Sequence, residues 1–416
     1  MRKVNIEGWQ TVRIIALARA FSILGDELAI FALLLREKHN GGGAIPIALI
    51  FTAGTLPLIL LAPWAGTIAD RIPIRRLAPF ANIAQAVPAG LLAFNTPLPV
   101  SLLLICLIGV GQAFTAPAWA ATLPEIVNRE ALPRALSLMQ AFYSIAGLLG
   151  PGVAGIMVSK LGYVTPMIAN AASFVVLALV PAFVVLPKRG RHVGPRIRGD
   201  VWVGLQIVRR DPVVRALTIL FFSLNLAAGI FSVAELFFAL DVLHASTFIY
   251  GLTASIFAGG MLGAALVNKR RDVSAARLPA NIIAGCLVAS LGIFLTGLSW
   301  HWAVLLPTAA LGGIGVSTLN SYGQALLLQR APEASRARLM SAVQAVSSIG
   351  QITSFAIAGI LVSLIEPRFA ILASGAACLL VLGVLSKTVL GSASQNQING
   401  AAVPGPITDL PINESE

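Results

Sequence analysis

The sequence predicts an all-α membrane protein with twelve transmembrane helices in two pseudo-symmetric halves of six. Hydrophobic residues make up 57% of the chain and charged residues only 11%, whereas soluble domains are about 25% charged. The apolar runs are about 20 residues or longer and do not alternate with period two, which predicts helices and not barrel strands. One long polar connection separates six runs from the next six.

Twelve apolar runs define the expected membrane spans. The first of them contains Arg19, Asp26 and Glu27 and is too long for a cleavable signal peptide. The expected spans cover residues 12–35, 44–68, 78–95, 98–121, 135–158, 163–186, 213–240, 246–268, 279–299, 302–328, 338–364 and 367–389.

Lys and Arg residues concentrate at the N-terminus and in every second connection between the runs. The connection after the second run contains Arg71, Arg75 and Arg76, and the connection after the sixth run is the most basic. This is the positive-inside pattern, which predicts a multi-pass protein of the cytoplasmic (inner) membrane with both termini in the cytoplasm. The net charge of +12 then follows from topology, and we expect no nucleic-acid partner.

The connections predict four regions. Residues 1–186 form the first half, 187–212 a cytoplasmic linker, 213–389 the second half and 390–416 a polar tail that we expect to be disordered. In the linker, Val201, Leu205 and Val208 share one side of a helix, with Trp202 beside them. This spacing predicts a short amphipathic helix on the cytoplasmic face.

Four ionisable residues lie well within the spans: Arg19, Asp26 and Glu27 in the first and Glu235 in the seventh. Charges inside a membrane are costly and usually face the protein interior. Carboxylates in partly dry cavities can take up and release protons, so these four are the proton-coupling candidates. Successive helical residues differ by about 100°, so we expect Asp26 and Glu27 to face different sides. The alternative is that some of them are solvated near the outer face.

Uncharged polar residues recur inside the spans. Each alone is explained by a hydrogen bond between helices, but together they suit a large, mostly apolar and weakly polar substrate. The substrate-cavity candidates are Gln112, Gln140, Asn225, Asn320, Gln324, Gln344 and Gln351.

Several other classes of protein are not supported. The three cysteines lie in apolar runs and the four histidines do not cluster, so we expect no metal and no cofactor. There is no nucleotide-binding loop and no catalytic triad pattern, so we expect no enzyme activity and a transport cycle driven by a gradient. Gly259 and Gly263 form a GxxxG motif inside a bundle of many helices, where it favours packing within one chain, and we expect a monomer.

Two motifs indicate moving parts. The connection from Gly66 to Arg76 is so short that its two helices should lie side by side and antiparallel, with Asp70 seeking a cationic partner. The stretch Gly150-Pro-Gly-Val-Ala-Gly155 fits G-x-G-x-x-G but lies inside an apolar span, so it is not a dinucleotide site. Pro151 should bend this helix while the small residues let a neighbour pack closely, although tight packing alone would also explain the stretch.

These residues resemble the Major Facilitator Superfamily. Gly66, Asp70, Arg71, Arg75 and Arg76 match its loop signature, which implies a conformational latch, and Gly150, Pro151 and Gly155 resemble its helix-5 antiporter motif. Phe21 to Asp26, Pro117 to Leu136 and Leu328 to Met340 resemble the branch of the enterobactin exporter and the macrolide efflux proteins.

The resemblance implies a proton-coupled exporter of amphipathic small molecules (a drug, macrolide or siderophore) that works by alternating access. Its expected partners are the substrate, protons and the lipid bilayer. In one departure, Leu107 stands near the position where many drug antiporters carry a proton-transferring Arg, and residues 106–112 hold no charge. Arg19 is a candidate substitute. The alternatives are uptake or facilitated exchange of a metabolite or lysolipid, and a membrane sensor or scaffold that does not transport.

Overall fold

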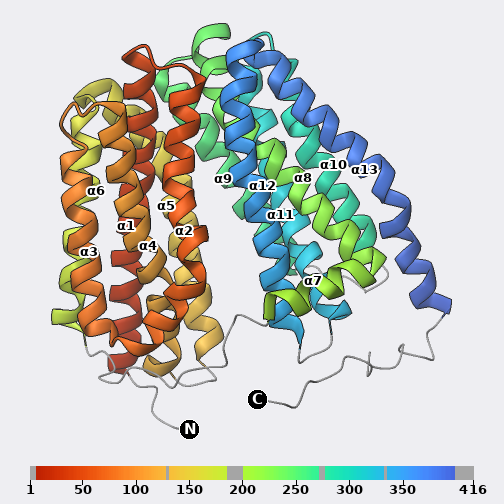
Figure 1. Cartoon of the computed structure of the whole chain (residues 1–416), viewed down its shortest axis with the longest axis horizontal. Helices are drawn as coiled ribbons and strands as arrows, with labels where there is room; N and C mark the ends of the chain where they lie inside the picture. Colours follow the sequence, from red (N-terminus) through yellow and green to blue (C-terminus); the bar gives the residue numbers. More distant parts are fainter. Residues whose placement is uncertain (1–5, 128–130, 185–199, 271–276, 332–334, 399–416) are drawn as a thin grey trace.

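The computed structural model describes residues 6–127, 131–184, 200–270, 277–331 and 335–398. The described residues form thirteen α-helices (Figure 1). The first six are α1 (Ile6–His39), α2 (Ala44–Arg71), α3 (Ile74–Leu91), α4 (Leu98–Ile126), α5 (Leu132–Leu161) and α6 (Val164–Phe183). The others are α7 (Asp200–Arg210), α8 (Pro212–Phe237), α9 (Thr247–Arg270), α10 (Leu278–Gly297), α11 (Leu305–Arg330), α12 (Arg336–Leu364) and α13 (Pro367–Ile398). A π-helical turn, η2 (Phe238–Val242), extends α8, and a 3-10 turn, η4 (Trp302–Val304), precedes α11.

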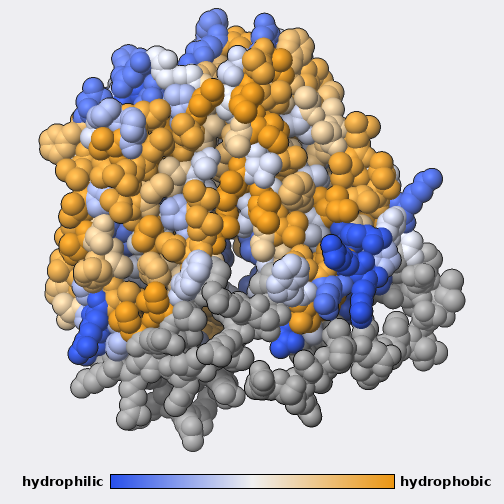
Figure 2. All heavy atoms as spheres, in the orientation of Figure 1, coloured by the Kyte–Doolittle hydropathy of each residue, from blue (hydrophilic) through white to orange (hydrophobic). Residues whose placement is uncertain are grey.

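Ten of these helices are long and apolar enough to cross a membrane. The two other long helices carry more charge: α1 contains Arg19, Asp26 and Glu27, and α3 begins with Arg75 and Arg76 close behind its first residue. The face of the molecule in Figure 2 is mainly hydrophobic, while hydrophilic residues gather toward its two ends. This surface suits a protein whose sides contact lipid.

The helices pack as two bundles, α1–α6 and α8–α13, as Figure 1 shows. In the first bundle, α1 packs against α5 and α6, α3 against α4 and α6, and α2 against α4. In the second, α8 packs against α12 and α13, α10 against α11 and α13, and α9 against α11. The bundles meet along two helix pairs, α5 with α9 and α2 with α12. The prediction that α2 and α3 lie side by side is wrong, because α4 packs against both of them.

Close backbone approach and stacked rings join the two bundles. A Cβ atom on Gly155 of α5 would lie 2.9 Å from the carbonyl oxygen of Thr247 at the start of α9, so only glycine permits this distance. Phe31 stacks on Tyr250 with 4.9 Å between ring centroids, and Phe51 stacks on Phe355 at 5.2 Å. The hydrophobic core is therefore continuous between the two bundles.

The linker contains the expected short helix. In α7, Gly204 and Val208 are buried and the helix packs on α12, whereas Trp202 is 70% exposed. At the other end of the second bundle, α13 continues to Ile398, beyond the span expected to end at residue 389. The rest of the tail, 399–416, lies outside the described residues.

Candidate functional site

A cavity of about 390 Å³ lies between the two bundles. Its lining comes from α1, α2 and α5 on one side and from α8, α9, α10 and α11 on the other. The lining is mostly apolar and includes Phe31, Phe231 and Phe257. Two carboxylates interrupt it, Glu27 from α1 and Glu235 from α8. A mostly apolar cavity with few polar groups is the usual form of a small-molecule site, and we call this the central cavity.

The α5 motif provides the space for Glu27. A Cβ atom on Gly150 would lie 2.5 Å from the Cβ atom of Glu27, so the missing side chain at Gly150 lets α1 and α5 approach here. Pro151, the next residue, lines the central cavity itself. The backbone N–H of Gly152 then donates a hydrogen bond to Ser255 Oγ of α9 at 3.0 Å. The motif thus contacts α1, the cavity and the opposite bundle within three successive residues.

Glu27 and Glu235 lie in the central cavity without a cationic partner among the residues that the structure describes. In the described part of the chain, no Lys, Arg or His side chain forms an ion pair with Glu27 or Glu235. A shielded carboxylate without a partner costs free energy. A proton or a bound cation would remove that cost.

A second cavity, of about 370 Å³, lies within the first bundle between α1, α2, α4 and α6. Asp26 lines it, and Gln112 Nε2 of α4 donates a hydrogen bond to Asp26 Oδ2 at 2.8 Å. Glu27 lines this cavity as well. Asp26 and Glu27 therefore share this cavity, although their contacts differ: Asp26 bonds to Gln112 of α4, whereas Glu27 lies against Gly150 of α5. Only Glu27 of the two also reaches the central cavity.

Arg19 lies nearer the start of α1. Its Nε atom donates a hydrogen bond to the Tyr143 hydroxyl of α5 at 2.7 Å, and its guanidinium lies 5.5 Å from the centre of that ring. The structure therefore places Arg19 with Tyr143 and not in an ion pair with Asp26. Gln140, one turn earlier on α5, is exposed and lines neither cavity.

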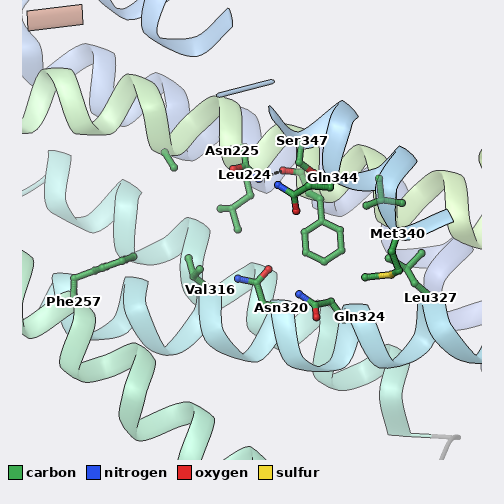
Figure 3. Close-up of a pocket in the computed structure, with 13 residues that line it drawn as sticks. Leu224, Asn225, Phe257, Val316, Asn320, Gln324, Leu327, Met340, Gln344 and Ser347 are labelled. Atoms are coloured by element: carbon green, nitrogen blue, oxygen red, sulfur yellow. Dashed lines mark hydrogen bonds between the residues drawn. The ribbon is translucent and has the colours of Figure 1, made fainter. Parts of the chain in front are cut away.

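A third cavity, of about 430 Å³, lies in the second bundle and is lined by amides (Figure 3). Asn225 comes from α8, Asn320 and Gln324 from α11, and Gln344 from α12. The amide of Asn225 donates to the carbonyl of Phe221 at 2.8 Å. We call this the amide cavity. It unites four of the seven substrate-cavity candidates, whereas Gln351, further along α12, lines none of the three cavities.

The central cavity adjoins each of the other two cavities. Glu27, Ile30 and Phe51 line both the central cavity and the one in the first bundle. Leu224, Ala228, Phe257 and Val316 line both the central cavity and the amide cavity. The central cavity therefore lies between the other two, with carboxylates on its side toward the first bundle and amides beyond its side toward the second.

An ion pair joins the bundles at the end of the molecule opposite to the start of α1 and the end of α13 (Figure 1). Lys38 Nζ, at the end of α1, lies 2.6 Å from Asp241 Oδ1 in η2, and it also lies 4.9 Å from the centre of the Phe237 ring. Toward the other end, where α7 lies, the bundles diverge (Figure 1). This pair could not be predicted from the sequence, because the two residues are 203 positions apart and neither stands in a motif.

The structure describes the side chains of only part of the predicted latch, Arg75 and Arg76. The α2–α3 connection is very short, since α2 ends at Arg71 and α3 begins at Ile74. Arg75 and Arg76 are exposed in the first turn of α3. The side chains at positions 66, 70 and 71 are outside the described residues, so no partner for Asp70 is assigned.

Comparison with known proteins places the chain among transporters. Residues 15–310 and 276–410 match the model of the Major Facilitator Superfamily. The chain is 29% identical to the multidrug efflux pump Tap of Mycolicibacterium fortuitum over 44% of its own length and 48% of Tap, so it spans about half of that relative. It is 23% identical to macrolide efflux protein A of Streptococcus pyogenes, covering 70% of this chain and 71% of that protein.

Two further matches extend the comparison. The lysophospholipid transporter LplT of Citrobacter koseri is 26% identical, covering 74% of this chain and 78% of LplT. The fold matches the crystal structure of a bacterial homologue of the human lysosomal transporter Spinster, in an inward-facing and unoccupied conformation, with a TM-score of 0.74 at 12% identity over 96% of this chain and 99% of that one. The family model covers most of the sequence and the bundle architecture agrees with it, so the chain belongs to the Major Facilitator Superfamily.

Proposed function

We propose that the protein is a proton-coupled exporter of amphipathic small molecules that works by alternating access. The observation that carries this proposal is the pair Glu27 and Glu235, which enter one apolar cavity from opposite bundles without a cationic partner among the described residues. A rocking motion of two bundles would expose such a site to each side of the membrane in turn. The efflux function in the names of Tap and macrolide efflux protein A supports export.

The proposal includes a specific membrane topology. We propose twelve spans, comprising α1–α6 and α8–α13, with both termini in the cytoplasm and the protein in the inner membrane as a monomer. Each of the five main helix pairs of the first bundle has a counterpart six spans later, for example α1 with α5 and α8 with α12, which supports pseudo-symmetry. Residues 187–212 would link the two halves on the cytoplasmic side. The ion pair of Lys38 and Asp241 would then close the outer side.

The proton role can be tested with carboxylate variants in proteoliposomes. We expect Asp26→Asn, Glu27→Gln or Glu235→Gln to remove the dependence of substrate transport on a pH gradient, because an amide cannot carry the proton. Glu366→Gln is the matched control, since Glu366 is exposed at the start of α13. If all three site variants keep the full gradient dependence, these carboxylates do not couple proton movement to transport.

Uptake or facilitated exchange of a metabolite or lysolipid is the second candidate function. It is favoured by the largely apolar lining of the central cavity, which would suit an acyl chain, and by the similarity to LplT. Transport measured in vesicles of known orientation separates the two functions, because an exporter moves substrate out of the cytoplasmic compartment when protons enter it. A sensor or scaffold that does not transport would move no solute under any imposed gradient.

A further inference from the structure

We propose that the central cavity and the amide cavity are two subsites for one substrate, an amphipathic amine whose body carries neutral hydroxyl or carbonyl groups. The inference rests on the proposed export function and defines the substrate class that the same site would take. It follows from the way the two cavities divide charge and hydrogen-bonding capacity between them.

The central cavity has the properties of an ammonium subsite. Its two carboxylates have no cationic partner among the described residues, so an incoming ammonium group would neutralise them. Phe31, Phe231 and Tyr250 line the same space, and aromatic faces attract cations that are shielded from water. An anionic group would find no cationic partner among the described lining residues and would be rejected.

The amide cavity has the opposite character. Its described lining includes no Lys, Arg, His, Asp or Glu. The side chains of Asn320 and Gln324 have no hydrogen-bond partner among the described residues, and Gln344 has only a contact of 3.5 Å with Ser348 Oγ. Figure 3 shows the amides of Asn320, Gln324 and Gln344 turned toward one shared space. Each amide side chain has hydrogen-bond donors and an acceptor. It can therefore bind hydroxyl and carbonyl groups of a substrate and does not select for a charged group.

A wetted entrance is the simpler explanation of these amides, because Gln324 and Gln344 are exposed. Contact with water, however, would not explain why the described lining has amides but no charged side chains, or why the amides come from three different helices. The described lining instead combines the amides with Phe221, Phe257 and Met340. Apolar walls with a few convergent polar groups are typical of ligand sites.

The geometry also sets the distance between the two functional groups of the substrate. Asn225 and Glu235 both lie on α8 and are ten positions apart, which corresponds to about 15 Å at 1.5 Å per residue. The residues that line both cavities, Leu224, Ala228, Phe257 and Val316, are apolar. The substrate should therefore have an apolar segment of about this length between its amine and its oxygen-bearing part.

Three fluorescent probes test the proposal by binding to purified protein in nanodiscs, at one pH and without a gradient. They share a naphthyl body and carry an ammonium group alone, a sugar group alone, or both groups about 15 Å apart. We expect Gln324→Leu to weaken binding of the two sugar-bearing probes about fivefold to tenfold, the loss of about one hydrogen bond. Binding of the ammonium probe should not change. We expect Glu235→Gln to weaken binding of both ammonium-bearing probes at least about tenfold while the sugar probe is unaffected.

The controls distinguish this proposal from a general loss of structure. Gln329→Leu replaces an exposed glutamine of α11 that lines none of the three cavities and should change nothing. Gln344→Leu should reproduce the effect of Gln324→Leu if the latter fails to fold. Equal effects of Gln324→Leu on all three probes, or no effect on any, would overturn the two-subsite proposal. So would a dual probe that binds no tighter than the ammonium probe. The binding assay involves no gradient, so a failure of proton coupling in proteoliposomes would not alter this result.

Discussion

Replacing Asp241 with Asn should weaken the closed end of the molecule. In the structure, Lys38 Nζ lies 2.6 Å from both carboxylate oxygens of Asp241, and the two side chains are 16% and 54% exposed. A half-exposed partner is screened by water, so the pair should contribute about 1 kcal/mol and not the several kcal/mol at stake in a buried pair. Because 1.4 kcal/mol corresponds to a factor of ten, the population with this end closed should fall about fivefold relative to the open state.

Spin labels at Ser159 and Trp300 can measure this shift, because each is exposed near the end of a helix on a different bundle. Pulsed electron paramagnetic resonance should show that a larger fraction of Asp241→Asn molecules than of parent molecules has a long distance between the two labels. Glu37→Gln is the matched control, since the adjacent Glu37 makes no ion pair within the described chain. The double exchange Lys38→Asp with Asp241→Lys should restore the parental distribution. An unchanged distribution in Asp241→Asn would refute the idea that this pair holds the end closed.

Two further substitutions test other parts of the mechanism. Gly150→Ala should lower the free energy of unfolding by about 1–3 kcal/mol and slow transport, because its Cβ would lie 2.5 Å from Glu27 Cβ. Gly147→Ala, where no atom lies within 4 Å of the added Cβ, should unfold at the parental temperature or above it, because Ala favours a helix more than Gly does. Equal melting temperatures of the two variants would contradict the argument. Asp70→Asn should abolish transport but not membrane insertion, and full vesicle transport by this variant would exclude the latch.

The periodicity of the sequence was sufficient to predict the helices but not their neighbours. Each expected span corresponds to one long helix, with ends shifted by a few residues, because lipid requires long apolar runs with internally bonded backbones. Which helices pack against each other depends on contacts between different spans, and the pattern of a single span does not show them. The short connection suggested that α2 lies beside α3, yet α2 packs against α4 and α12.

The charges at helix ends show the same limit. Positive-inside counting treats Arg36 as one of the few cations of the sparse connections. In the structure it is 7% exposed and donates hydrogen bonds to the carbonyl oxygens of Leu92 at 2.6 Å and Phe94 at 3.0 Å. It therefore satisfies carbonyl groups at the end of α3, which a helix leaves without internal partners. A residue count records the charge of Arg36 but not this distant contact.

The sequence was sufficient to predict the kinds of residue that form the candidate site, but not which of them line the same cavity. Intramembrane carboxylates and amides stand out in the sequence because they are costly in lipid. A single helix fixes the angle between Asp26 and Glu27, but the cavity wall decides which side chains share a space. That wall is built by α2, α4 and α6 around Asp26 and by α5, α8 and α9 around Glu27.

Glu27 consequently has a position that no other candidate shares, since it lines both the cavity of Asp26 and the cavity of Glu235. If a proton and an ammonium group each neutralise the carboxylates of the central cavity, they compete for the same charge. Arrival of one would then favour departure of the other, which is the requirement for exchange transport. Coupling in this form needs no arginine on α4, and it explains how a chain with Leu107 near that position could still exchange protons for substrate.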